Sequence, residues 1–267
     1  SAPMPSSVRP AANTVADAAS VIPSLDAAIE ELRAGSRTWS ALTLSQRIRL
    51  LRSIRATVAT EAEDWALTAA RAKGLDLGSP LVGEEWLTGP YATVVAIDAY
   101  IETLTSLRVG ASPLDRLRVN TAPGDRVRVH AFPTSAVDGL LVSGFSGEVW
   151  LRPGVTLADA QRKAGLGQLL PNESGGVGLV LGAGNITSIP VLDVLYELIA
   201  HNRVSILKIN PTQDPLAPVF GRALAPLISL GLLRIVQGGG EVGAALTEHA
   251  GIDHVHITGA ARTFETV

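Results

Sequence analysis

The sequence contains no cysteine among its 267 residues. This absence excludes disulfide bonds, thiolate metal sites and a cysteine nucleophile within these residues. It is typical of proteins from the reducing cytoplasm, where we expect this protein to act. No uninterrupted apolar run reaches the roughly 18 residues that a membrane span requires, so the sequence predicts no membrane partner. Aromatic residues make up only 4% of the chain, but 46% of all residues are hydrophobic, which is enough for a globular core.

An excess of charge of either sign is also missing. The chain carries 22 basic and 25 acidic residues, which gives a formal net charge of -3 at pH 7. Nucleic acids and anionic membranes attract proteins through concentrated positive charge. The sequence therefore predicts no nucleic-acid partner.

The amino-terminal part of the chain consists of two segments of different composition. Residues 1–23 are rich in Ser, Ala and Pro and lack the basic start and apolar core of a signal peptide, so we expect a flexible leader. Residues 24–125 show helical periodicity and predict a helical layer. Its first helix is expected behind Ser24 and to end at Gly35, because glycine commonly follows the last turn of a helix.

Local signals predict where the next helices of this layer begin. Thr43 with Gln46 forms a capping-box pattern, and Thr60 with Glu63 forms another, so we expect a helix start at each. Pro90 is typical of the first turn of a helix. Apolar residues follow it at helical spacing: Val94, Ile97, Ile101 and Leu104.

Residues 126–171 predict strands instead. Apolar residues from Val127 alternate with Arg126, Arg128 and His130, a period of two that is typical of a strand with one solvated face. Two further short segments with strand character follow, Leu140–Val142 and Glu148–Leu151. We expect these segments to form two or three strands in antiparallel contact.

From residue 172 to 267, strands and helices alternate regularly. The expected strands are 177–181, Val204–Ile209, Leu233–Val236 and His254–Thr258, and the expected helices are Pro190–His201, Pro215–Ser229 and Glu241–His249. Continuous apolar strands joined by helices predict a parallel, doubly wound sheet. In such sheets ligands bind beyond the carboxyl ends of the strands.

The first two strand ends carry polar or small residues. The first is followed by Gly182-Ala183-Gly184-Asn185, which is either a phosphate-binding turn or an ordinary tight strand-to-helix turn. The second ends in Lys208, followed by Asn210. A lysine that closes an apolar strand must reach water or an anion, so Lys208 either contacts a cofactor or extends to the surface.

The last two strand ends repeat this chemistry. The third is followed by Gly238, Gly239 and Gly240, with Glu241 and Gly243 in the helix that they open. Such a turn leaves the amides at the helix N-terminus accessible to phosphate. The fourth ends in Thr258-Gly259-Ala260. Four such turns at the same end of one sheet predict a nucleotide-binding site.

These residues resemble the cofactor-binding domain of the aldehyde dehydrogenase superfamily, from about residue 176 to the end. The resemblance implies that Asn185 supplies an oxyanion-hole amide and that Lys208 contacts the adenosine ribose of NAD or NADP. It further implies that the turns at Gly238–Gly243 and Thr258–Ala260 hold the cofactor.

Three positions depart from the family pattern. Asn210 stands where a serine or glutamate usually follows the lysine, which leaves both NAD and NADP as candidate cofactors. Ala260 replaces the usual serine, and Phe264 replaces a common glycine. Together with the turn after Asn185, these differences suggest a divergent branch that is similar to the acyl-CoA reductases.

The resemblance implies an oxidoreductase that acts on a small aldehyde or acyl substrate through a cysteine thiohemiacetal. The family's cysteine and general-base glutamate follow the turn at Thr258, so we expect this chain to be an incomplete, truncated part of a longer enzyme and inactive alone. The intact enzyme is expected to be a homo-oligomer. A non-catalytic nucleotide-binding or assembly module of the same fold is the alternative, and a reductase of acyl phosphates is a third hypothesis.

The histidines do not predict a metal site. The sequence has five, His130, His201, His249, His254 and His256. His254 and His256 share one face of a strand, but no third ligand accompanies them in the sequence. We therefore expect no bound metal.

Overall fold

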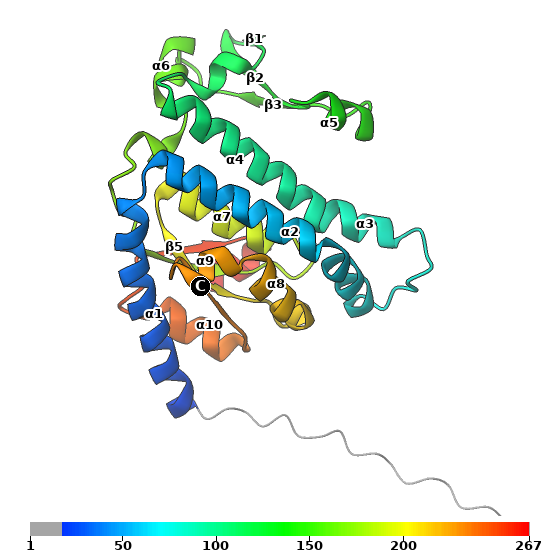
Figure 1. Ribbon diagram of the computed structural model, residues 1–267, viewed down its shortest axis with the longest axis vertical. Helices are drawn as coiled ribbons and strands as arrows, with labels where there is room; N and C mark the ends of the chain where they lie inside the picture. The colour runs from blue at the N-terminus through cyan, green and yellow to red at the C-terminus, as the bar shows by residue number, and fades with distance from the viewer. Residues whose placement is uncertain (1–17, 267) are drawn as a thin grey trace, which may run out of the picture.

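A computed structural model describes residues 18–266 (Figure 1). The predicted leader up to residue 17 lies outside the described residues. The first helix, α1 (Ala18–Ala41), begins before the expected start and continues through Gly35. The expected helix end at Gly35 is wrong because this glycine serves a close contact: a Cβ there would lie 1.8 Å from the Gly231 carbonyl oxygen. Gly35 therefore lets α1 pack directly on the turn at Gly231.

The second helix, α2 (Leu44–Ala72), is a single long element. Its capping box is confirmed, because the Thr43 side chain accepts from the Gln46 amide and the Gln46 side chain accepts from the Thr43 amide. The second expected start is wrong. The Thr60 hydroxyl donates to the Ala56 carbonyl one turn earlier, which satisfies this side chain inside a continuous helix.

The next helical stretch has three consecutive parts: α3 (Val82–Trp86), the π-helical turn η1 (Leu87–Tyr91) and α4 (Ala92–Arg108). Pro90 lies inside the π-helical turn and does not begin a helix as expected. Proline has no amide hydrogen to donate in an α-helix, and the wider turn accommodates it. The predicted apolar face of α4 is confirmed, with Ile97 and Leu104 fully buried.

A small antiparallel sheet follows, with strand order β1-β2-β3. Its strands are β1 (Val119–Ala122), β2 (Arg126–Phe132) and β3 (Gly147–Trp150). Antiparallel pairing is confirmed, but the expected strand at Leu140–Val142 is wrong. This segment forms the end of α5 (Ala136–Leu141), whose N-terminus is capped by Ser135. Leu140 is 79% exposed, so its apolar side chain does not mark a buried strand. Short helices flank the sheet: η2 (Pro113–Arg116), α6 (Leu157–Lys163) and η3 (Leu166–Leu169).

The carboxyl-terminal part contains a four-stranded parallel sheet, as the sequence predicted, and the structure gives its strand order as β6-β5-β4-β7. Its strands are β4 (Val177–Leu181), β5 (Val204–Lys208), β6 (Leu233–Val236) and β7 (His254–Ile257). The connecting helices are α7 (Ile189–His201), α8 (Ala217–Ala223), α9 (Ala225–Ser229) and α10 (Gly240–Thr247), with α11 (Ala261–Thr266) after β7.

One expected helix of this region is divided into three. The segment predicted as Pro215–Ser229 consists of the 3-10 helix η4 (Pro211–Leu216) followed by α8 and α9. Pro218 and Pro226 each lie in the first turn of their helix. Proline is tolerated there but not in a helix interior, so the prolines separate the pieces.

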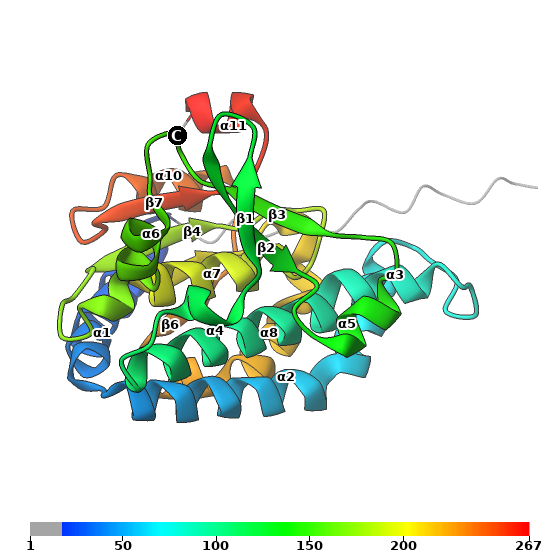
Figure 2. The same ribbon diagram turned by 90° about the horizontal axis from the view of Figure 1, so that it is seen from above.

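Helices cover both faces of the parallel sheet, as a doubly wound fold requires. Figure 1 shows α7 on one side of the sheet and α10 on the other, and Figure 2 shows α2 at the edge of the molecule, beyond α4 and α8. Helix α1 contacts β5, β4 and α10, whereas α2 packs on α4 and α8. Within residues 18–266, no helix is long and apolar enough to cross a membrane.

A buried cation ties these layers together. Arg47 of α2 is 0% exposed and donates to the Gln168 and Asn202 side-chain oxygens, each at 2.9 Å, and to the Trp39 carbonyl at 2.8 Å. It also donates to the Pro171 carbonyl. The guanidinium lies 4.0 Å from the Trp39 ring centre. One side chain therefore joins α1, α2 and the segment before β4 to the end of α7.

Replacing Arg47 by methionine (R47M) tests this role. The change leaves buried carbonyl oxygens without a donor, and each such loss costs about 1–3 kcal/mol. We expect the free energy of unfolding in urea to fall by about 3 kcal/mol or more. R49M alters an exposed arginine of the same helix and is expected to change it by less than about 0.5 kcal/mol. Equal effects of the two substitutions would contradict the assignment.

Candidate functional site

The parallel strands end at one level, which brings the four predicted turns together. Leu181 at the end of β4 is in register with Lys208 of β5 and with Ile257 of β7. Lys208 is in turn in register with Val236 at the end of β6. The residues that follow these positions therefore meet at one edge of the sheet, as the sequence predicted.

A cleft of about 840 Å³ opens at this edge. All predicted site residues except Gly238 and Glu241 line it: Gly182, Gly184, Asn185, Lys208, Asn210, Gly239, Gly243, Thr258, Gly259 and Ala260. Other lining residues were not singled out from the sequence, and they include Thr212, Thr247 and Glu248. The volume lies within the about 300–1,000 Å³ that is common for small-molecule sites.

The turn after β4 packs tightly on the turn after β5. A Cβ at Gly184 would lie 2.8 Å from both the side-chain nitrogen of Asn210 and the hydroxyl oxygen of Thr212. The Thr212 hydroxyl donates to the Gly184 carbonyl at 3.0 Å, and the Asn210 side-chain oxygen accepts from the Thr212 amide. Asn210 is thus the cap of η4, a role that an asparagine followed by proline and threonine could have indicated.

Asn185 and Lys208 present polar groups to the cleft. Asn185 is exposed, and within residues 18–266 its side-chain amide makes no hydrogen bond. The side chain of Lys208 is only 9% exposed and forms neither a hydrogen bond nor an ion pair with a described residue. Desolvation lowers the pKa of Lys208, although the nearby charges of Asp214 and Glu241 act to raise it. An ammonium in this setting favours an anionic or polar ligand.

The glycine turn after β6 differs from the expectation in one respect. Gly238 has φ +141°, a backbone conformation that favours glycine. The Glu241 carboxylate accepts from the Gly239 amide at 3.2 Å. This amide at the start of α10 is therefore occupied by Glu241, and it is not open to phosphate as the sequence suggested.

The turn after β7 is anchored to α7. The Thr258 hydroxyl donates to Asp193 Oδ2 at 2.9 Å, which fixes the side chain at the wall of the cleft. Gly259 and Ala260 follow it directly before α11 and are exposed. Both residues line the cleft, so the segment directly before α11 places no large side chain there.

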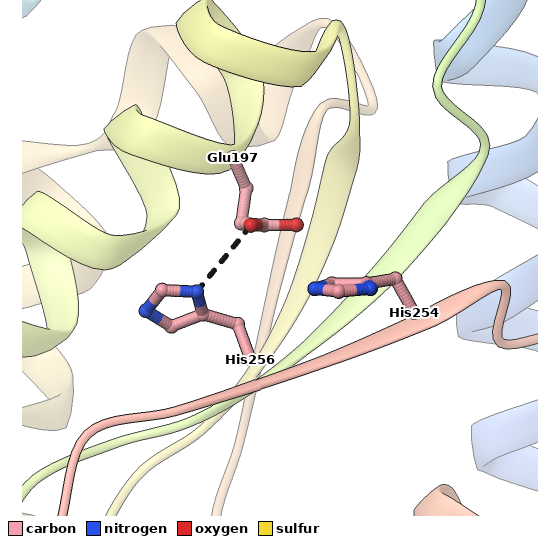
Figure 3. A group of neighbouring side chains, drawn as sticks. All are labelled: Glu197, His254 and His256. Carbon is pink, nitrogen blue, oxygen red and sulfur yellow. Dashed lines mark ion pairs between the residues drawn. The ribbon is translucent and has the colours of Figure 1, made fainter. Parts of the chain in front are cut away.

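A second cluster lies on the α7 side of β7 (Figure 3). The expectation that His254 and His256 lack a third ligand is wrong, because Glu197 of α7 points toward both. His256 Nδ1 lies 3.4 Å from Glu197 Oε1, and His256 Nε2 lies 3.2 Å from Asp193 Oδ1. The sequence could not show this grouping, because Glu197 comes from a helix more than fifty residues away.

Charges within this cluster shift its pKa values. Burial alone would raise the pKa of Glu197, but the neighbouring His256 and Arg203 outweigh burial and lower this pKa to about 2. The carboxylates of Asp193 and Glu197 beside its ring nitrogens raise the pKa of His256 to about 9. Desolvation and the charge of Arg203 lower the pKa of His254.

Comparison with known proteins finds similarity only at the level of structure. No family model matches the sequence, and no curated protein matches it. A proposed methylmalonate-semialdehyde dehydrogenase from Sinorhizobium meliloti, complexed with NAD, is 16% identical with a TM-score of 0.55. A 1-pyrroline-5-carboxylate dehydrogenase is 18% identical with a TM-score of 0.56. A glyceraldehyde-3-phosphate dehydrogenase from Methanocaldococcus jannaschii, complexed with NADP, is 15% identical with a TM-score of 0.52.

These similarities cover most of this chain but a minor part of the other proteins. Each match includes 91% of this chain and between 38% and 43% of the length of the matched protein. The chain therefore has an aldehyde dehydrogenase-like fold, of which it makes up one portion. The resemblance expected from the strand-end residues is confirmed at the level of the fold.

Replacing Gly238 by alanine (G238A) tests the turn after β6. Alanine at position 238 would keep a backbone φ that is strained for residues with a side chain, and its Cβ would lie 2.4 Å from Val242 Cγ2. Backbone strain of this kind costs about 1–3 kcal/mol. G240A is a matched control, because a Cβ at Gly240 meets no atom within 4 Å. We expect thermal unfolding at a lower temperature for G238A only. A G238A protein as stable as G240A would contradict the strained turn.

Proposed function

We propose that this chain is the cofactor-binding part of an NAD(P)-dependent aldehyde dehydrogenase-like oxidoreductase. The observation that carries the proposal is the cleft at the carboxyl ends of four parallel strands, with the nearly buried, unpaired ammonium of Lys208 in its wall. Two of the structurally similar dehydrogenases are complexed with NAD or NADP, which supports a nicotinamide cofactor for this fold.

The residues of the cleft fit such a cofactor. Lys208 would contact the adenosine ribose, and the turn at Thr258–Ala260 would face the phosphates through backbone amides and small side chains. Gly184 lets the turn after β4 pack against Asn210 and Thr212 at the wall of the cleft. Glu241 carries a negative charge beside this site, so a phosphate bound at the Gly239 amide requires its carboxylate to turn away. The bound cofactor would supply hydride acceptor or donor chemistry.

Among the residues of the cleft, we assign one to the substrate. Asn185 has an amide without a hydrogen-bond partner among the described residues, and it would donate to the oxyanion formed from an aldehyde or acyl carbonyl. Without cysteine in this sequence, the thiolate nucleophile of such a mechanism must come from residues outside it. We therefore propose that this chain alone binds the cofactor but does not turn over an aldehyde.

The absence of cysteine favours one alternative, a non-catalytic nucleotide-binding or assembly module. The reading frame after Val267 distinguishes the two. A cysteine preceded by a glutamate there supports the enzyme, and the lack of both supports the module. In either case we propose a cytoplasmic homo-oligomer. Apolar side chains exposed on α5 and the small sheet, Leu140, Leu141, Val149 and Trp150, support self-association.

Titration with NAD and NADP, followed by calorimetry, tests the proposal. Replacing Lys208 by methionine (K208M) removes a charged contact worth about 1.5–3 kcal/mol, so the dissociation constant is expected to rise by about tenfold or more. K163M alters an exposed lysine of α6 and is expected to leave it unchanged. Failure of both nucleotides to bind the parent chain would overturn the cofactor assignment.

A further inference from the structure

The cluster of Glu197, His254 and His256 has the composition and spacing of a metal site. The two histidines are two residues apart on β7, at the edge of the sheet among the described strands, and their side chains share the face that Glu197 approaches from α7 (Figure 3). One ligand atom from each residue lies within 4.8 Å of the other two. None of the three lines the nucleotide cleft, so this is a separate place in the molecule.

The backbone around Glu197 is shaped to hold its carboxylate there. Gly178 of β4 is in register with His254, and a Cβ at Gly178 would lie 3.2 Å from Glu197 Oε2 and 2.9 Å from Arg203 Cδ. The glycine therefore makes room for the Glu197–Arg203 ion pair, whose atoms are 2.5 Å apart, against the sheet. This pair fixes one carboxylate oxygen and turns the other toward the histidines.

The second oxygen of Glu197 has no adequate partner. Glu197 is 1% exposed, and its Oε1 makes no hydrogen bond within residues 18–266. His256 Nδ1 is 3.4 Å away, beyond the about 2.7–2.9 Å of a charge-assisted hydrogen bond. A buried carboxylate oxygen without a close partner is costly. A cation between Oε1 and Nδ1 would satisfy both atoms.

Asp193 completes the arrangement from behind His256. Its Oδ1 lies 3.2 Å from His256 Nε2, so Nε2 would keep its hydrogen while a cation displaces the proton from Nδ1, the nitrogen that faces Glu197. A carboxylate behind a ligating imidazole is the usual outer contact of metal-bound histidines.

We propose that Glu197, His254 and His256 bind a divalent cation of the zinc class, with solvent as the fourth ligand. Two imidazoles and one carboxylate suit Zn²⁺ or Co²⁺ and do not suit Mg²⁺ or Ca²⁺, which prefer oxygen ligands. The exposed position of His254 leaves the site open to water. Once a cation replaces the proton on His256, the carboxylates of Glu197 and Asp193 outnumber the guanidinium of Arg203, so the surroundings compensate its positive charge.

Calorimetric titration of the untagged, chelator-treated chain with Zn²⁺ tests the site. We expect one ion per chain. H254Q and H256Q each remove one ligand and are expected to weaken binding at least tenfold, and D193N is expected to weaken it about 10–100-fold because it alters an outer contact. H249Q is the matched control, since His249 pairs with Asp26 away from the cluster.

Titration with Co²⁺ distinguishes a metal ligand from a residue that only supports the fold, because the visible absorption of Co²⁺ depends on its ligands. A four-coordinate site gives the visible absorption of tetrahedral Co²⁺, and H254Q is expected to abolish it while circular dichroism shows an intact fold. His254 is exposed, so its loss removes no core packing. Absence of Zn²⁺ binding in the parent chain, or binding that H254Q and H256Q leave unchanged, would overturn the proposal.

Discussion

The structure depends on a positive charge that is buried without a carboxylate. Arg47 is fully enclosed, yet every group that it donates to is neutral. Desolvation lowers its pKa to about 10, which still leaves the guanidinium charged at neutral pH. A buried charge that has no opposite charge beside it needs hydrogen-bonding groups around it, here carbonyl and side-chain amide oxygens. The segments that supply these oxygens must therefore pack around α2 in one arrangement.

Asn202 transmits this constraint to the sheet. It ends α7 in the left-handed conformation (φ 51°), and its side-chain oxygen accepts from Arg47, Gln168 and Trp39 together. Strand β5 begins two residues later and ends at Lys208. The position of the strand, and with it the place of Lys208 in the cleft, thus follows from a polar network at the opposite end of the strand. One short strand therefore connects the buried Arg47 network to the cleft.

The sequence predicts the parallel sheet and its cleft because their signals are local. Short apolar strands, glycine turns and Lys208 at a strand end can each be recognised without knowing their neighbours. The errors arise where tertiary contacts decide. Gly35 looks like a helix end until its contact with Gly231 is known, and Leu140 looks like a strand residue until its exposure is known. Glu197 could not be assigned to the histidines because only the parallel pairing of β4 with β7 brings α7 beside them.

Asp193 connects the two sites that the chain brings together. One of its carboxylate oxygens contacts His256 and the other accepts from Thr258 in the wall of the cleft. A cation beside His256 would draw on the same carboxylate that holds the Thr258 hydroxyl, so occupancy of the proposed metal site would alter the hydrogen bonding of Thr258. Any such coupling would be reciprocal, because a ligand that changed the affinity for the cation would have its own affinity changed by the same factor. The shared carboxylate is a direct physical path between sheet edge and cleft.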